Sequence, residues 1–539
     1  MLARASRDAR GVVCSGPGAG RTVGSVPASE PFVPLDKPTN QPISDPSGPM
    51  AVSPETTSIA VTSRAKLSWL DRAHRVVASD KAPTWSLDLR AIQDGVEEER
   101  ARRVVDLAMR IAESLLSTGA SAAEVTAGVL RITSVYGLRS VHVDVTFTSI
   151  LLCHYRGAEP PITVMRTVRV RTADYERLAR LQGLVADIED DKELGLEAAR
   201  RRFETIAGMP RPYRRSVVTL ATAVLGMAVC LLLDGSSTEI ALSLLNAVIV
   251  DRTQLWLARR RMPAFFAQVV GGSIPTIVAV ALIYGRANQW IGLGDVSASA
   301  VVATGIVVLL AGLSVVGAAQ DAIDGYYLTA TARSAEVVAL TLGIIVGVLV
   351  VLTLANALGA PTYLAPYSRL SGSLTVQVVA SALIAGAFAI SSYAGPRTAL
   401  VCVVTGSLGW TVYAFAAMAG LGPAASSGVA ALVVGVIAQV LARVWRAPSL
   451  ALTTAGIVPL LPGLAVYRGL YQLAGYGGSQ GYGPAFDTLG GAMAIGLALA
   501  TGVSLGGYLG RAAVVRDSGG AGDKARTRAL RRSVADAKE

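Results

Sequence analysis

Three aspartates beside long apolar runs are candidates for carrying protons. Asp251 interrupts one hydrophobic run, and Asp321 and Asp324 follow another. A spacing of three places the last two carboxylates on one face of a helix. Neighbouring carboxylates raise one another's pKa, which suits a group that binds and releases protons. The alternatives are an ion pair between Asp251 and Arg252 at a helix end, and a solvated helix end for Asp321 and Asp324.

A second set of residues could line a path for a small polar molecule through an apolar helical region. Glycines allow helices to approach closely, prolines interrupt them, and an amide offers both a donor and an acceptor. The alternative is that such residues only pack and hydrogen-bond neighbouring helices. The candidates are Gln268, Gly271, Gly272, Gly312, Pro459, Pro462 and Gly463.

Four further residues could be catalytic groups or metal ligands in a more polar part of the chain: His142, Asp144, Cys153 and His154. His142 and Asp144 share one face of a predicted strand. No spacing typical of a zinc or redox site is present, either here or among the four cysteines of the whole chain. We therefore expect structural or solvated roles for these residues, and we predict neither a metal nor a cofactor.

The composition divides the chain into a polar part and an apolar part. Of 539 residues, 52% are hydrophobic and only 16% are charged, whereas about 25% is usual in soluble proteins. Charged residues are frequent from Met1 to Arg215, and long apolar runs follow from Ser216 to Gly510. The net charge of +11 fits basic residues beside anionic lipid headgroups. No basic stripe with interleaved aromatics is present, so nucleic-acid binding is not expected.

The polar part is predicted to contain a disordered extension and a small domain. Residues 1–90 are rich in Pro, Ser and Gly and are predicted to be disordered. Residues 91–210 are predicted to form a cytoplasmic α+β domain. Its first helix is amphipathic, with apolar residues at Val104, Leu107, Ala108, Ile111 and Leu115.

The remaining elements of this domain follow from local signals. Ser121 and Glu124 resemble a capping box that opens a second helix through about 135. Val141, Val143, Val145 and Phe147 alternate with polar residues and predict a half-buried strand, which runs on or bends into 150–155. Pro160-Pro161 is expected to end that strand, a further strand is predicted over 162–170, and one helical pattern covers 174–202, with Leu178, Leu181, Leu184, Val185 and Ile188 on one side.

The apolar part is predicted to cross a membrane about ten times, because each span needs about 20 mostly apolar residues. Basic residues gather in the loops on the side of the N-terminal domain, so both termini, including the basic tail 511–539, are expected in the cytoplasm. The two membrane halves are 211–358 and 359–510. The predicted spans are 216–233, 239–257, 264–284, 298–318, 335–357, 375–393, 398–418, 424–442, 450–470 and 486–509.

One short motif occurs twice. Residues 305–313 and 456–464 are identical at seven of nine positions with an offset of 151 residues. They lie in the fourth and ninth predicted spans, and an offset of five spans would give the two copies opposite orientations. This pattern predicts an inverted 5+5 repeat, an architecture of secondary transporters. In the second copy, Pro459, Pro462 and Gly463 are expected to break the helix. The alternative is that Gly and Pro are simply common in membrane helices.

Several motifs together resemble the threonine/serine exporter family. They are Val143–Ile150, Tyr155-Arg156-Gly157, the basic stretch 166–171, Asp174–Leu178, the helix ending at Leu115–Ala120, Pro263–Gly272 and Asp321–Gly325. The resemblance covers about 95–510. It implies a multi-pass protein of the plasma membrane that exports threonine and serine using the proton motive force. Ala311 stands where the second copy has Pro462, which leaves the break in the first copy open.

Two other functions are alternatives to transport. The N-terminal domain could be a hydrolase that the membrane part anchors, or the chain could be an export-complex scaffold whose N-terminal domain dimerises or regulates. Ten spans exceed what an anchor needs, and no nucleotide-binding signature is present. We therefore expect a secondary transporter without enzymatic activity, with protons and the lipid bilayer as partners. A homo-oligomer is an open alternative to a single chain.

Overall fold

The computed structural model describes most of the chain after residue 97. The described ranges are 98–156, 159–168, 171–191, 194–287, 297–309, 312–359, 372–473 and 483–536, with side chains in the last range only to Ala512. All of them belong to one compact unit. The predicted disordered extension 1–90 and the side chains of most of the basic tail lie outside the described residues.

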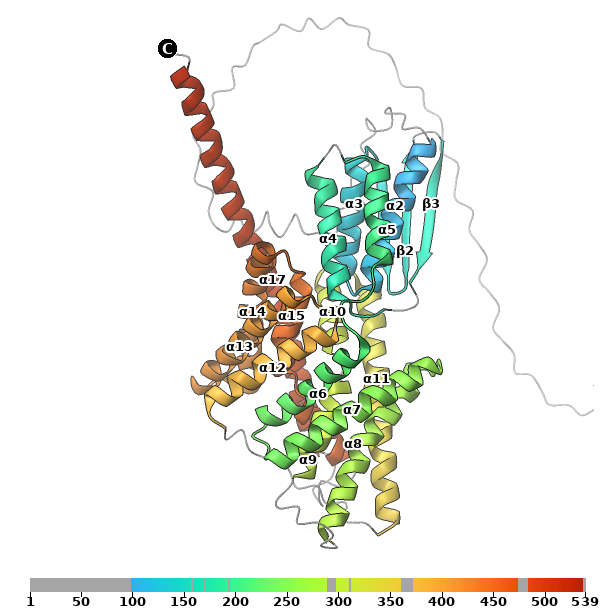
Figure 1. The fold of residues 1–539 in the computed structure, drawn as a ribbon, viewed down its shortest axis with the longest axis vertical. Helices are drawn as coiled ribbons and strands as arrows, with labels where there is room; N and C mark the ends of the chain where they lie inside the picture. Colours follow the sequence, from blue (N-terminus) through green and yellow to red (C-terminus); the bar gives the residue numbers. More distant parts are fainter. Residues whose placement is uncertain are drawn as a thin grey trace, which may run out of the picture. The chain divides into compact units, whose positions relative to one another are not determined.

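The N-terminal domain consists of four helices and one antiparallel sheet with the strand order β1-β2-β3. The helices pack on one face of the sheet (Figure 1). Its elements are α2 (Glu98–Ser117), α3 (Ala122–Val135), β1 (Val141–Thr146), β2 (Ser149–Arg156), β3 (Glu159–Thr167), α4 (Tyr175–Asp190) and α5 (Leu196–Gly208). The predicted apolar stripes of α2 and α4 are buried in full, so the amphipathic pattern is confirmed.

Three predicted strand boundaries in this domain are wrong, and one predicted helix is two helices. The first strand ends at Thr146, because Phe147 and Thr148 form the turn into β2. Pro160 and Pro161 lie inside β3. Because β3 is an edge strand, it can contain residues that lack a backbone N–H for the ladder of the sheet. That strand ends at Thr167, and the helical pattern predicted over 174–202 is divided between α4 and α5.

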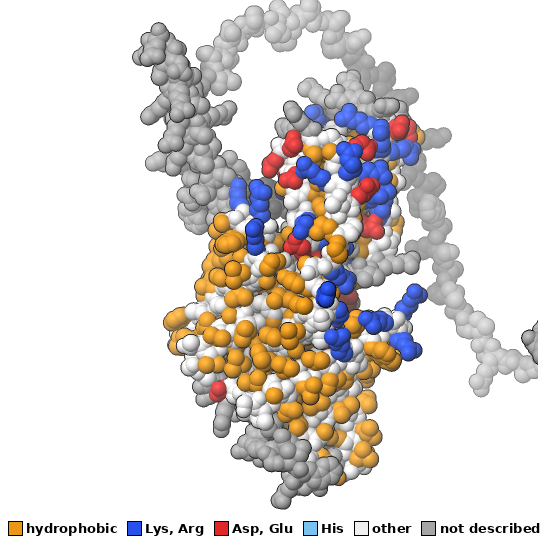
Figure 2. All heavy atoms as spheres, in the orientation of Figure 1, with side chains coloured by type: hydrophobic (Ala, Val, Ile, Leu, Met, Phe, Trp, Pro, Cys, Tyr) orange, Lys and Arg blue, Asp and Glu red, His pale blue; other side chains and the backbone are white. Residues whose placement is uncertain are grey.

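Eight helices of the described residues are long and apolar enough to cross a membrane. Hydrophobic side chains cover their visible face, whereas charged side chains concentrate on the N-terminal domain (Figure 2). Such a large exposed apolar surface is typical of contact with lipid rather than water. The eight helices are α6 (Arg215–Leu232), α7 (Ser237–Arg259), α8 (Ala264–Ala287), α11 (Tyr327–Ala357), α12 (Leu374–Ser391), α13 (Pro396–Met418), α14 (Pro423–Trp445) and α17 (Gly483–Asp536).

The ninth predicted span is divided into shorter helices, and the fourth contains two described helices on either side of residues 310 and 311, which lie outside the described residues. The fourth comprises α9 (Ala298–Leu309) and α10 (Gly312–Ile323). The ninth comprises α15 (Ser449–Ile457), the 3-10 helix η2 (Val458–Leu460) and α16 (Gly463–Tyr471). The remaining eight predicted spans coincide with the eight long helices. The count of ten crossings stays a prediction, because the two divided segments do not meet the length of a continuous span.

The two membrane halves share one pattern of helix packing. In the first half, α8 contacts α7, α9 and α11, and α10 contacts α11. In the second half, α14 contacts α13, α15 and α17, and α16 contacts α17. Each element of the first half thus has a counterpart with corresponding neighbours. The helices α6 and α12, which are themselves counterparts, pack against each other, as expected for an internal repeat.

Glycines bring the central helices of both halves into close contact. A Cβ atom at Gly272 of α8 would lie 2.7 Å from the Ile344 carbonyl oxygen of α11. At the corresponding interface, a Cβ atom at Gly435 of α14 would lie 2.7 Å from the Val503 carbonyl oxygen of α17. Only glycine allows backbones to approach this closely. The predicted close contact at Gly272 is therefore confirmed.

Candidate functional site

The two divided segments resume at equivalent positions of the repeated motif. The first segment resumes with α10 at Gly312 and the second with α16 at Gly463, and these glycines are 151 residues apart. In the second copy, Pro459 lies within η2 and Pro462 is the residue that precedes α16. The predicted break at Pro459, Pro462 and Gly463 is therefore confirmed. In the first copy, residues 310 and 311 between the two helices lie outside the described residues.

Gln268 and Gly271 belong to α8 and lie against Leu309, the last residue of α9. Nε2 of Gln268 donates to the Leu309 carbonyl oxygen over 3.5 Å. Its Oε1 atom is buried and has no hydrogen-bond partner in the part of the chain that the structure describes. A Cβ atom at Gly271 would meet the Leu309 side chain at 2.9 Å. The structure thus brings these two candidates together at the break, whereas Gly272 faces α11.

Asp251 is held by α6 rather than by its neighbour Arg252. Its Oδ1 atom lies 2.8 Å from Nη2 of Arg215, and its Oδ2 atom accepts a hydrogen bond from Thr219 over 2.7 Å. The side chain is only 10% exposed. This arrangement neutralises the carboxylate near the start of α6, where the chain leaves the N-terminal domain.

Asp321 joins the membrane helices to the N-terminal domain. Its Oδ2 atom lies 2.9 Å from Nη1 of Arg333, and both side chains are buried. Its Oδ1 atom accepts a hydrogen bond from the Ala122 backbone N–H over 3.2 Å. Ala122 is the first residue of α3, so the carboxylate lies at the positive end of that helix. Nη2 of Arg333 completes the junction with a 3.4 Å bond to the Ala120 carbonyl oxygen.

Asp324 has a different environment from Asp321, although three residues separate them. The helix α10 ends at Ile323, and Asp324 follows in a turn that closes at Gly325, whose φ is +88°. The Asp324 side chain lines a cavity of about 380 Å³, whereas Asp321 is buried in its ion pair. The two carboxylates therefore do different things, and only Asp324 lines this cavity.

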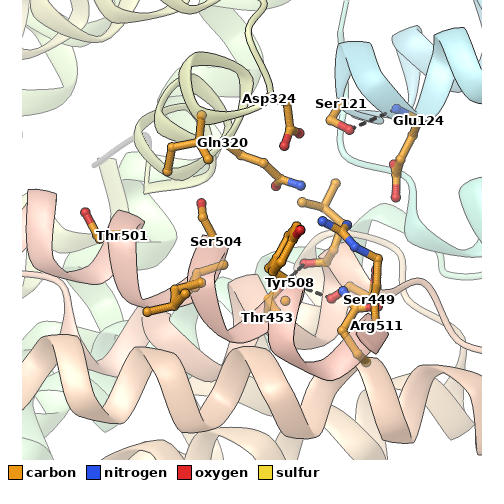
Figure 3. Close-up of a pocket in the computed structure, with 16 residues that line it drawn as sticks. Ser121, Glu124, Gln320, Asp324, Ser449, Thr453, Thr501, Ser504, Tyr508 and Arg511 are labelled. Atoms are coloured by element: carbon orange, nitrogen blue, oxygen red, sulfur yellow. Dashed lines mark hydrogen bonds between the residues drawn. The ribbon is translucent and has the colours of Figure 1, made fainter. Parts of the chain in front are cut away.

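The cavity lies between the N-terminal domain and the second membrane half, with one wall from the end of α10 (Figure 3). Charged groups of both signs line it: Glu124 from α3, Asp324 after α10, and Arg511 from α17. Hydroxyl and amide groups make up much of the remaining wall. They are Ser121, Gln320, Gln439, Ser449, Thr453, Thr501, Ser504 and Tyr508.

Glu124 is a residue that sequence reasoning assigned only to helix capping. Its backbone N–H donates to Oγ of Ser121 over 3.2 Å, so the N-cap at Ser121, which is one of the two bonds of the predicted capping box, is confirmed. Its carboxylate extends into the cavity (Figure 3), where Oε2 is buried without a hydrogen-bond partner among the described residues. Burial raises the pKa of this carboxyl, and Asp324 and Asp321 add to the rise, while the Ser121 backbone and Arg511 oppose it.

The N-terminal domain is attached to the membrane helices at two further places. The backbone N–H groups of Tyr175 and Glu176, in the first turn of α4, donate to the carbonyl oxygens of Ser392 and Tyr393 over 3.1 Å each. The hydroxyl of Thr329 donates to the Val145 carbonyl oxygen of β1 over 3.0 Å. The buried apolar core of the domain also continues into α12, α13 and α15.

Of the four polar candidates on the sheet, His142 and Asp144 line one cavity of about 380 Å³, whereas Cys153 and His154 do not line it. His154 points inward and is 5% exposed, with Nδ1 3.1 Å from the Ser140 carbonyl oxygen, and burial lowers the pKa of its imidazole. His142 is on the outer face, where its ring packs edge-on against Tyr155. Among the described residues, no three His, Cys, Asp or Glu side chains are grouped as metal ligands would be.

The fold defines a polytopic helical membrane protein with an N-terminal domain in water, and comparison with known proteins places it more narrowly. A family model described as "Putative threonine/serine exporter" matches residues 106–355, and a model described as "Threonine/Serine exporter, ThrE" matches residues 377–507. The chain belongs to the threonine/serine exporter family.

Two curated relatives cover most of the chain. A "Probable threonine/serine exporter" of Mycobacterium tuberculosis is 36% identical over 424 residues, which are 77% of this chain and 78% of the relative. A "Threonine/serine exporter" of Corynebacterium glutamicum is 32% identical over 462 residues, which are 84% of this chain and 89% of the relative. No solved structure matches the chain.

Proposed function

We propose that this protein exports threonine and serine from the cytoplasm as a proton-driven secondary transporter. The observation that carries the proposal is the match to relatives named as threonine/serine exporters over 77% and 84% of the chain. The geometry supports it, because a polar cavity with charges of both signs lies where the N-terminal domain meets the membrane helices. A small polar solute needs such a site to enter an otherwise apolar bundle.

The orientation with both termini in the cytoplasm belongs to the same proposal. Basic residues at the ends of α7 and α14, such as Arg259, Arg260 and Arg443, are expected on the cytoplasmic side. The contacts at Asp321, Thr329 and Ser392 attach the N-terminal domain to helix ends on that same predicted side.

The proposed proton carriers are Asp251, Asp321 and Asp324. Ion pairs with Arg215 and Arg333 hold the first two, so each can accept a proton only when its pair opens. Asp324 lines the cavity beside Glu124, and we place the main proton-binding role there. A substrate path past Gln268, Gly271, Gly312, Pro459, Pro462 and Gly463 would connect this cavity to the helix breaks.

Transport is better supported than hydrolysis by the N-terminal domain. A hydrolytic site would need its nucleophile and base within hydrogen-bond reach of each other. His142 and His154 lie on opposite faces of the sheet, and Cys153 does not line the cavity that His142 and Asp144 share. We propose on this basis that the domain serves transport and is not an enzyme.

Counterflow in proteoliposomes tests the proposed substrate. Vesicles loaded with unlabelled threonine should take up labelled threonine and serine and should not take up labelled lysine or glutamate. Empty vesicles and vesicles loaded with lysine are the controls. If folded protein catalyses no exchange of either hydroxy amino acid, the proposed substrate is wrong.

An imposed pH gradient tests the coupling. Asp321→Asn and Asp324→Asn should abolish the stimulation of efflux by the gradient while the protein remains inserted. Gradient-driven efflux at the wild-type rate in a variant would remove that aspartate from the proton path.

A further inference from the structure

The charges around the cavity match the two charged groups of a free amino acid. A zwitterion carries a carboxylate and an ammonium on the same carbon atom. Arg511 approaches from α17, while Glu124 and Asp324 approach from α3 and from the end of α10 (Figure 3). Arg511 and Glu124 line the same cavity, so both groups can act on one small molecule.

Two buried polar atoms in the wall have no hydrogen-bond partner among the described residues: Oε2 of Glu124 and Oγ of Ser504. An unsatisfied buried polar atom costs about 1–3 kcal/mol, and more when it is charged. Such atoms are rare in native proteins, and a ligand or water usually satisfies them. Their presence on opposite elements of one cavity, α3 and α17, indicates a site that a polar ligand completes.

The size and the remaining wall also fit a small hydroxy amino acid. A volume of about 380 Å³ lies at the small end of the range of ligand pockets, roughly 300–1,000 Å³. Hydroxyl and amide side chains, including Thr453 and Gln439, lie among apolar residues such as Leu450 and Val503. A substrate hydroxyl would find partners among these side chains.

We propose that this cavity binds the backbone groups of the exported amino acid, with Arg511 receiving the carboxylate and Glu124 together with Asp324 receiving the ammonium. The inference rests on the proposed function and assigns it a site. Its main consequence is that the N-terminal domain supplies a substrate ligand directly, through Glu124 of α3. The hydrogen bond from Ala122 to Asp321 attaches the same helix to α10. The proposed substrate site and α10 are therefore linked through α3.

Competition binding to the full-length protein in detergent tests this assignment. Labelled threonine would be displaced by unlabelled threonine, by threoninol, which lacks the carboxylate, and by 3-hydroxybutyrate, which lacks the ammonium. The variants are Arg511→Gln and Glu124→Gln. Matched controls are Arg259→Gln, at the exposed end of α7, and Glu189→Gln, which pairs with Arg131 on the surface of the N-terminal domain.

Each cavity variant should lose one specific preference. Arg511→Gln should bind threonine roughly ten- to a hundredfold more weakly and bind threoninol unchanged, because a charge-assisted hydrogen bond to the carboxylate is lost. Glu124→Gln should weaken the binding of threonine by a similar factor and leave the binding of 3-hydroxybutyrate unchanged. Both controls should bind like the wild type. Ser504→Ala, a smaller change, should weaken threonine less and serves if a charge variant does not fold.

The outcomes separate this site from the transport function itself. Absence of threonine binding and counterflow in the wild type would overturn the proposed function and this site with it. Wild-type counterflow would leave the function standing. Unchanged analogue preferences in Arg511→Gln and Glu124→Gln, together with an unchanged threonine affinity in Ser504→Ala, would then overturn the site.

Discussion

Asp321 and Arg333 form a buried ion pair, 2.9 Å from oxygen to nitrogen, at the point where α10, α11 and the start of α3 meet. A buried pair of this kind holds one arrangement of its helices, because neither charge can find water without moving an element. The pair therefore connects the divided fourth segment with the domain that carries Glu124.

Breaking this pair should destabilise the protein strongly. Arg333→Gln leaves the Asp321 carboxylate buried without its cation, and we expect a loss of about 3–5 kcal/mol. Asp321→Asn should lose a similar amount, and the double variant should lose less than the sum of the two. Thermal unfolding in detergent, followed by size-exclusion fluorescence, measures the change. The exposed pair Glu98–Arg102 is the control, since solvent screens it and its removal should leave the unfolding midpoint nearly unchanged.

Glu124 should make stability depend on pH in a predictable direction. Burial raises the pKa of its carboxyl in the folded state above the value of about 4.3 that it has in an unfolded chain. The folded state therefore binds the proton more tightly, and the stabilising contribution of protonation is lost as pH rises through the folded-state pKa. The difference in thermal unfolding midpoint, Glu124→Gln minus wild type, should increase as the pH of the measurement is raised from 4.5 to 8.5. A constant difference would contradict the raised pKa.

Gly347 should be intolerant of a methyl group. A Cβ atom there would collide with the Val269 carbonyl oxygen and lie 3.0 Å from the Ser273 backbone nitrogen. Gly347→Ala should therefore separate α8 from α11 and cost at least about 1–3 kcal/mol. Gly285→Ala is the control, because nothing lies within 4 Å of a Cβ atom at that position of α8. Equal unfolding midpoints for the two variants would show that α8 and α11 do not pack this closely.

Gln268 should matter more for transport than for stability. Its Oε1 atom is unsatisfied at the end of α9, and its bond to Leu309 is long, so Gln268→Ala should change the unfolding free energy by less than about 1 kcal/mol. If the substrate passes the break, the variant should slow threonine counterflow about tenfold. Normal counterflow combined with a large loss of stability would instead identify Gln268 as a packing residue.

The fold could be predicted where one physical signal dominates. The apolar stripe of α2 and the eight long spans follow from burial in the N-terminal core or in lipid, and both are confirmed. The break near Pro462 was predictable because proline removes a backbone donor at that position. The end of β1 could not be predicted, because the alternation of apolar and polar residues continues through Phe147 although the backbone already turns there.

The candidate site was harder to predict, because it depends on contacts between distant segments. Asp321 and Asp324 look alike in the sequence, but α10 ends between them. Asp321 pairs with Arg333 of α11, whereas Asp324 lines the cavity. The position of Glu124 at the start of α3 already explained this residue. No local signal shows that its carboxylate lines the same cavity as Arg511, which is several hundred residues away in the sequence. The spacing of polar residues therefore located candidates without revealing which of them meet.

The equivalent starts of α10 and α16 have an evolutionary consequence. In a transporter assembled from two identical chains, one residue would have to serve both helix breaks. Once two copies are joined in a single chain, each break can accumulate its own substitutions. Ala311 and Pro462 occupy the same position of the motif and record such divergence. A proline restricts the backbone and an alanine does not, so the two copies of the motif carry residues of different backbone stiffness at this position.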